Sequence, residues 1–168
     1  MTHSVHTGVL GVLLLTIACA PEAEEPGQTA RATVSPEQAV ADPVMLTYHP
    51  DLQIDVTEMI HRASGLMYQD VTEGAGTPLA AGRTAVVRYT VWLHDGTLIE
   101  SNRDLEPFAF RVGAGDVIEG WDEGLVGMRT GGQRRLIVPY KLGYGETGSG
   151  DVPPYATLVF DLELLEIR

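Results

Sequence analysis

Apolar and polar residues alternate along four segments in the C-terminal part of this chain. In residues 84–93, Val87 and Tyr89 alternate with polar neighbours, which is the pattern of a strand with one buried face. The same period of two runs through residues 107–112, 133–138 and 157–167. Antiparallel strands that cover a core on one side and meet water on the other have this pattern, so we expect these segments to form an antiparallel sheet.

A helical period replaces this alternation before residue 128, and we expect one short helix near residues 119–126. Glycine costs roughly 1 kcal/mol relative to alanine inside a helix, so Gly120 and Gly124 suggest that another surface approaches closely. Asp122 and Glu123 are expected on the solvent side. One helix with several antiparallel strands predicts an α+β fold. The apolar stripe of this helix consists of Val117, Trp121, Leu125 and Met128.

The N-terminus has an uninterrupted run of apolar and small residues, 8–18, which ends at Cys19, the only cysteine of the chain. The run is shorter than the about 20 apolar residues that span a membrane, and it fits a secretory signal peptide, predicted as residues 1–18. The residues up to Cys19 resemble a bacterial lipoprotein signal. That resemblance implies a lipid anchor on Cys19. Because Ala20 follows instead of aspartate, it also implies that the protein is located in the outer membrane, facing the periplasm, if the cell has one.

A plain secretory signal with an incidental cysteine is the alternative. Thr16 stands where the lipoprotein pattern usually has an aliphatic residue, and the first seven residues contain no Lys or Arg. A lone cysteine excludes an intramolecular disulfide, and a free thiol is vulnerable in an oxidising compartment. Lipidation would remove that thiol, which favours the lipoprotein interpretation.

Composition divides the rest of the chain into three parts. Residues 19–44 are rich in Ala, Glu, Pro and Thr without aliphatic periodicity, and are expected to form a disordered tether. Residues 45–63 form an N-terminal arm or extra strand, because an alternation of apolar and polar residues runs from Leu52 to Val56. Residues 64–168 form the compact domain.

The charge of the chain excludes one class of partner. The formal net charge is −12 and the isoelectric point is about 4.6, which argues against nucleic acid, because binding of phosphate backbones rests on clustered Lys and Arg. The five histidines are scattered without ligand spacing, so no metal site is expected. The run Gly113-Ala114-Gly115 lacks the strand–helix context of a nucleotide loop and predicts a turn.

Four stretches of the domain share a recognisable pattern. They are Val87-Arg88-Tyr89-Thr90 with Asp95-Gly96-Thr97, then Pro107-Phe108-Ala109-Phe110, then 117–128, and finally Val138-Pro139 through Leu142-Gly143-Tyr144-Gly145 to 153–160. In order and spacing they resemble the FKBP-type peptidyl-prolyl isomerases, over about residues 65–168. The resemblance implies a twisted antiparallel sheet wrapped around one short helix. It also implies catalysed rotation about the amide before proline, with no metal or cofactor.

The resemblance further implies roles for residues at matching positions. Trp121 would be the floor under the proline ring, while the Ile118 N–H and the Tyr144 hydroxyl would donate to substrate carbonyls. Tyr89 and Glu100 complete the implied catalytic set. The implied pocket residues are Phe108, Val117, Phe160, Ile99 and Val152. The implied partners are Xaa-Pro segments of unfolded or exported proteins and macrolide inhibitors of the FKBP class.

Two matched positions depart from the family pattern. Ile99 replaces the usual phenylalanine, which keeps that position apolar but removes a flat ring. Glu100 replaces the usual aspartate, which keeps the negative charge. The predicted function is a peptidyl-prolyl cis-trans isomerase that assists the folding of exported proteins in the bacterial cell envelope. The alternative is a non-catalytic binding module or holdase that grips proline-containing segments with the same pocket.

Overall fold

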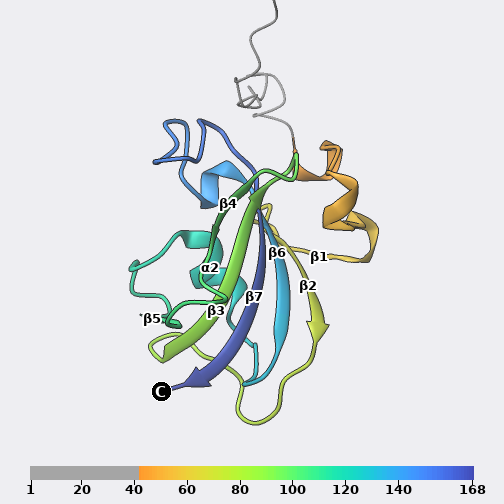
Figure 1. Ribbon diagram of the computed structural model, residues 1–168. Helices are drawn as coiled ribbons and strands as arrows, with labels where there is room; N and C mark the ends of the chain where they lie inside the picture. Colours follow the sequence, from red (N-terminus) through yellow and green to blue (C-terminus); the bar gives the residue numbers. More distant parts are fainter. Residues whose placement is uncertain (1–41) are drawn as a thin grey trace, which may run out of the picture. The chain divides into compact units, whose positions relative to one another are not determined.

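A seven-stranded sheet is the framework of residues 42–168, which are the residues that the computed structural model describes (Figure 1). Every pairing in this sheet is antiparallel. The strand order is β1-β2-β6-β7-β3-β4, and β5 pairs with β3 beside this path. The strands are β1 (Ile60–His61), β2 (Met67–Thr72), β3 (Thr84–Leu93), β4 (Leu98–Ser101), β5 (Phe108–Arg111), β6 (Gln133–Val138) and β7 (Leu158–Ile167).

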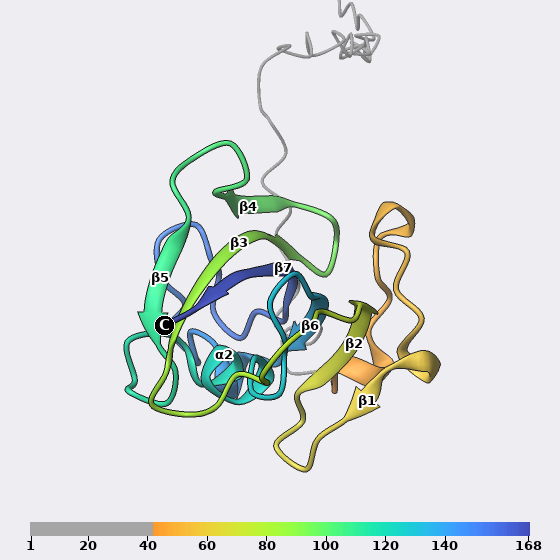
Figure 2. The same cartoon turned by 90° about the horizontal axis from the view of Figure 1, so that it is seen from below.

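One α-helix occurs among these residues, α2 (Glu119–Gly124), and the sheet curves around it (Figure 2). The predicted α+β fold, a twisted antiparallel sheet around one short helix, is therefore confirmed. The four segments predicted from alternation correspond to β3, β5, β6 and β7. Short 3₁₀ helices complete the described part: η1 (Pro43–Met45), η2 (Pro50–Leu52), η3 (Val56–Glu58) and η4 (Tyr140–Leu142).

The alternation does not predict β1, β2 and β4, because these strands bury few residues. Strand β2 buries only Met67 and Tyr68 at its start, and its last three residues are exposed. Strand β4 has four residues, none of them fully buried. Their backbone pairing to neighbours, rather than an apolar face of their own, makes them strands.

Of the two alternatives for residues 45–63, an arm or an extra strand, the stretch from Leu52 to Val56 does not form a strand. The 3₁₀ helices η2 and η3 occupy this segment, and Asp55 accepts a hydrogen bond from the Thr57 N–H at 2.9 Å. An aspartate that bonds backbone two residues ahead stabilises a turn in competition with extended backbone. Leu52 is buried and Val56 half-buried, so the alternation records burial along an irregular arm.

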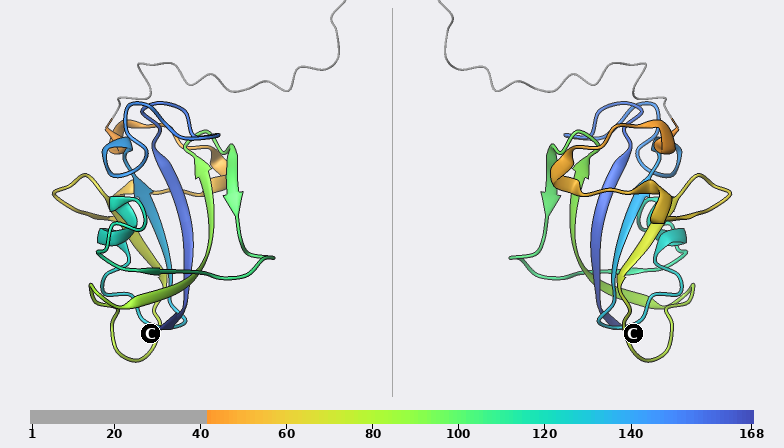
Figure 3. Two further views of the ribbon diagram at one scale, coloured as in Figure 1. Left: turned by 90° about the vertical axis from the view of Figure 1, so that its left-hand side faces the viewer. Right: turned by 90° about the vertical axis from the view of Figure 1, so that its right-hand side faces the viewer.

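The arm packs on the face of the sheet opposite to α2 (Figure 3). Successive strand residues point to opposite faces, so Met67 and Ile137 face the arm while Tyr68 and Leu136 join the core around α2. Met59 of the arm is buried against the first pair. The sheet therefore carries apolar residues on both faces at β2 and β6.

Arg135 fastens the arm to the sheet. Its guanidinium donates twice to Asp161 on β7, at 2.6 and 2.8 Å. A third bond runs from Nη1 to the Leu52 carbonyl at 2.7 Å. The fork is planar and fixed, so the pairing with Asp161 orients the bond to the arm.

The two helix glycines let α2 lie directly on β6. A Cβ on Gly120 would come within 2.5 Å of a Val138 methyl, and one on Gly124 within 2.8 Å of a Leu136 methyl. The close surface expected from these glycines is therefore the strand itself. The helix spans Glu119–Gly124, shorter than the predicted 119–126, so of the four stripe residues only Trp121 lies within it.

A buried arginine ties the end of this helix to the sheet. Arg134 is 5% exposed and forms a bidentate pair with Asp70, at 2.7 and 2.9 Å. Its Nη1 also donates to the carbonyl of Gly124, at 2.6 Å. Cations near helix C-termini satisfy the free carbonyls there, so Arg134 takes the place of a capping residue.

The contact of Gly120 with Val138 is tested by a double-mutant cycle. Gly120→Ala should destabilise the fold by about 1–3 kcal/mol, although alanine is the better helix former, because the new methyl overpacks the contact. In a Val138→Ala background the same change should cost less than about 0.5 kcal/mol. Urea unfolding followed by circular dichroism measures both. Equal costs in the two backgrounds would show that Val138 does not set the requirement for glycine.

Candidate active site

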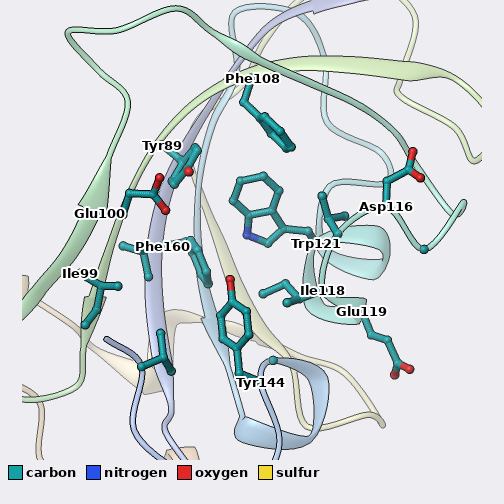
Figure 4. A pocket seen from close by; sticks show the side chains of 15 residues that line it. Tyr89, Ile99, Glu100, Phe108, Asp116, Ile118, Glu119, Trp121, Tyr144 and Phe160 are labelled. Carbon is teal, nitrogen blue, oxygen red and sulfur yellow. The ribbon is translucent and has the colours of Figure 1, made fainter. Parts of the chain in front are cut away.

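A cavity of about 560 Å³ opens between the start of α2, strands β3 and β4, and the loop after η4 (Figure 4). All ten residues that the sequence predicted for the site line this cavity. They are Tyr89, Ile99, Glu100, Phe108, Val117, Ile118, Trp121, Tyr144, Val152 and Phe160. The structure therefore brings together residues that are up to 71 positions apart, from Tyr89 to Phe160.

Trp121 is the centre of the site. It is 5% exposed, and four aromatic rings surround its indole. Tyr89 and Phe160 meet it edge-on, with centroids at 5.0 and 5.4 Å and interplanar angles of 79° and 77°. Phe108 and Phe110 lie at 6.2 and 5.5 Å. Edge-to-face packing of this kind fixes ring orientation, so the floor of the cavity is rigid and apolar.

Two tyrosine hydroxyls and the Glu100 carboxylate form one polar part of the cavity. Burial, then a hydrogen bond with Glu100 and the charge of Glu100, raise the pKa of Tyr89 to about 12. Burial, followed by the charge of Glu100, also raises the pKa of Tyr144. Both phenols therefore stay protonated at neutral pH and remain hydrogen-bond donors. Tyr144 is 41% exposed, so it stands at the mouth of the cavity.

The Ile118 backbone also points to a binding role. Ile118 is the N-cap residue of α2 in extended conformation, with φ −61° and ψ 148°. Within the described part of the chain its N–H donates to no protein acceptor. Free N–H groups at the start of a helix are available to a ligand carbonyl.

Asn102 is a positioning residue that the sequence did not reveal. It is 6% exposed, accepts a hydrogen bond from the Tyr89 N–H at 2.7 Å and donates to the Val87 carbonyl at 3.3 Å. A side-chain amide thus continues the pairing of β3 where β4 has ended. Asn102 stands in the polar run 100–104, and no pattern of the sequence singles it out.

Asp122 corrects a prediction. It was expected to be a solvated charge, but its carboxylate accepts hydrogen bonds from the Gly113 N–H at 2.7 Å and the Gly115 N–H at 3.1 Å. Both glycines have positive φ, 76° and 75°, as a tight turn requires. Asp122 therefore holds the 112–117 turn, which carries Val117 into the cavity.

The loop after η4 is closed by its own backbone. The Gly148 N–H donates to the Tyr144 carbonyl at 3.2 Å, and the Tyr155 N–H donates to the Gly145 carbonyl at 3.0 Å. A Cβ on Gly148 would lie 2.3 Å from the Val152 carbonyl oxygen, so glycine permits the close crossing. These contacts hold Tyr144 and Val152 on the same rim.

The cavity has further lining residues that were not assigned to it from the sequence: Val91, Gly115, Asp116, Glu119 and Gly143. No cluster of His, Cys, Asp and Glu suited to a metal occurs among residues 42–168. Apolar side chains, hydrogen-bond donors and carboxylates line this site.

Comparison with known proteins identifies the class. Residues 76–165 match the family described as FKBP-type peptidyl-prolyl cis-trans isomerase. The FK506-binding protein of Neisseria meningitidis serogroup B is 46% identical over 105 residues, covering 61% of this chain and 96% of that protein. FK506-binding protein 4 of Emericella nidulans is 39% identical over 109 residues, covering 65% of this chain and 23% of that protein.

Solved structures agree. FkpA from Escherichia coli superposes with a TM-score of 0.62 at 36% identity, covering 71% of this chain and 55% of that chain. AtFKBP13 has a TM-score of 0.62 at 34% identity, covering 66% of this chain and 99% of that chain. The chain belongs to the FKBP-type peptidyl-prolyl cis-trans isomerases, and the prediction of a peptidyl-prolyl isomerase is confirmed.

The predictions for the N-terminus concern residues that the structure does not describe. The signal peptide and Cys19 lie outside the described residues, as does all of the tether except residues 42–44. No helix among the described residues is both long and apolar enough to cross a membrane. The lipid anchor and the cell envelope stay predictions from the sequence.

The influence of Glu100 on the tyrosines is testable by titration. Glu100→Gln should lower the pKa of Tyr89 from about 12, because the charge is lost, yet leave it above 10, because burial is the larger cause. The phenol is favoured in the folded state, so its contribution to stability is complete below pH 10 and is lost between pH 10 and about 12. Glu100→Gln should therefore make that loss smaller and complete it at lower pH.

Ultraviolet absorbance of the phenolates measures this titration. Glu119→Gln is the matched control, because Glu119 lines the same cavity and is not among the causes of the shift at Tyr89. Equal tyrosine titrations in both variants would contradict the assignment of the shift to Glu100.

Proposed function

We propose that this protein catalyses prolyl isomerisation on exported proteins in the bacterial cell envelope, with Cys19 as its lipid anchor. The observation that carries the catalytic part is the aromatic cavity over Trp121 with protonated donors at its rim. The envelope part is supported by the sequence alone, by the apolar run 8–18 that ends at Cys19.

Isomerisation of a prolyl amide breaks no covalent bond. The barrier of about 18–20 kcal/mol is the loss of amide resonance when the C–N bond twists. A planar amide is more polar than a twisted one, so a dry aromatic cavity favours the twisted state, and catalysis follows from this difference in binding. The proline ring would lie on Trp121, between the rings of Tyr89 and Phe160.

The polar groups fix the pose of the substrate in this proposal. The Ile118 N–H and the Tyr144 hydroxyl would each donate to a substrate carbonyl. Glu100 would keep Tyr89 protonated and oriented. The cavity would take macrolides of the FKBP class through the same apolar floor, with Ile99 in place of an aromatic contact.

A non-catalytic holdase is the second candidate. It is favoured by Ile99 and Glu100, which depart from the family pattern within the cavity. The two functions differ in one respect: a holdase would bind proline-containing segments without accelerating their isomerisation.

The catalytic proposal predicts graded losses in kcat/KM for a short Xaa-Pro peptide. Tyr144→Phe should lower it about two- to tenfold, the worth of one hydrogen bond. Trp121→Phe should lower it on the order of tenfold, because part of the apolar floor is lost. Trp92→Phe is the matched control, since Trp92 is half-buried on β3 and does not line the cavity.

Circular dichroism confirms that each variant folds. A folded wild type that binds the peptide but does not accelerate isomerisation would establish the holdase. Equal losses in the Trp92 and Trp121 variants would remove Trp121 from the mechanism.

The anchor is tested separately by growing a bacterium that expresses the full chain with labelled palmitate. The protein should be labelled and recovered with membranes, whereas Cys19→Ser should be unlabelled, because thioether attachment needs the thiol. An unlabelled wild type whose mature N-terminus differs from Cys19 would support the plain secretory signal instead.

A further inference from the structure

Among the described residues, three carboxylates and no lysine or arginine line the cavity. Glu100, Asp116 and Glu119 are all exposed, and none forms an ion pair with a residue of the described part. Figure 4 shows Glu100 on one side of the Trp121 indole and Asp116 and Glu119 on the other. A segment that crosses the cavity over Trp121 therefore passes between carboxylates.

We infer that the cavity selects proline-containing segments that carry Lys or Arg immediately before or after the proline. The inference rests on the proposed isomerase function and names the substrate class for the same site. Two of these carboxylates, Asp116 and Glu119, take no part in holding the turn or the aromatic floor. Their negative charge is therefore available to a ligand that enters the cavity.

A second feature of the cavity restricts the ligand. Trp121 is 5% exposed, and its buried indole N–H has no hydrogen-bond partner among residues 42–168. Figure 4 shows the nitrogen edge of the indole turned toward Phe160 and Tyr144. A buried donor without a partner carries a free-energy cost that an acceptor removes.

Together these features of the cavity favour a positively charged peptide as its ligand. A small anion would meet three like charges, and a hydrocarbon would leave the indole N–H, the Ile118 N–H and the Tyr144 hydroxyl without acceptors. A peptide segment supplies carbonyls for the donors and, at Lys or Arg, a cation for the carboxylates. Lys and Arg also reach outward on long apolar stems, which suits an apolar cavity with charges at its rim.

The net charge of −12 attracts cationic peptides to the whole surface, so local and general effects have to be separated. Glu123 provides the comparison. It is on the same helix as Glu119 and differs from it in not lining the cavity. Glu119→Gln and Glu123→Gln change the net charge equally.

The test measures kcat/KM of the full chain on peptides that are identical except for Lys, norleucine or Glu next to the proline, placed on either side. Norleucine matches the stem of lysine without its charge. The Lys peptide should exceed the norleucine peptide by about three- to tenfold in at least one position, and the Glu peptide should be the poorest substrate, as expected for charges at a rim. In 1 M salt, where the screening length is about 3 Å, the ratio should approach one.

The variants locate the effect. Asp116→Asn with Glu119→Gln should reduce the ratio of Lys to norleucine at least about twofold, and adding Glu100→Gln should bring it near one. Glu123→Gln should keep the wild-type ratio. A wild-type ratio of one in both positions, or an equal fall in the Glu119 and Glu123 variants, would overturn the inference.

Failure of the isomerase function has a different signature. If no peptide is isomerised faster than in buffer, the proposed function fails, and calorimetric dissociation constants for the same peptides then decide the preference by itself. Tighter binding of the Lys peptide that disappears in the double variant would support the inference for a holdase. Equal dissociation constants would overturn it there as well.

Discussion

The approach of α2 to β6 is the constraint on which the rest of the molecule depends. Gly120 and Gly124 remove the side chains that would separate helix and strand, and the helix then lies against Val138 and Leu136. Trp121, between these glycines in the helix, is thereby pressed against rings from β3, β5 and β7. Protein interiors are close-packed, so moving the helix away by the width of one methyl group would also displace Trp121, which forms the floor of the cavity.

Polar side chains rather than regular pairing position the walls of the site. Asn102 bonds to the β3 backbone at Tyr89, and Asp122 holds the turn that precedes Val117. Each replaces a backbone partner at a point where a strand or turn has ended. The site can therefore combine an apolar floor with loops of irregular shape, without leaving these backbone groups unsatisfied.

The arm and the cavity lie on opposite faces of one sheet. Arg135 binds both Asp161 of β7 and the Leu52 carbonyl of the arm, while Phe160, the preceding residue of β7, faces the cavity. The arm covers Met67 and Ile137, which would otherwise be exposed apolar surface. In this way the segment that follows the predicted tether belongs to the folded domain and leaves the mouth of the cavity free.

The sequence by itself determined the long elements and the membership of the site. Period-two alternation predicted β3, β5, β6 and β7, because each has one face in the core, and the motif pattern named ten residues that all line the cavity. It did not predict β1, β2 or β4, and for the segment that contains Leu52 to Val56 it left an arm and a strand open as alternatives. Tertiary structure decided these, since short strands are made by their neighbours' hydrogen bonds. It also decided the partners of Asp122, Asn102 and Arg134, because those partners come from other parts of the chain and no local pattern records them.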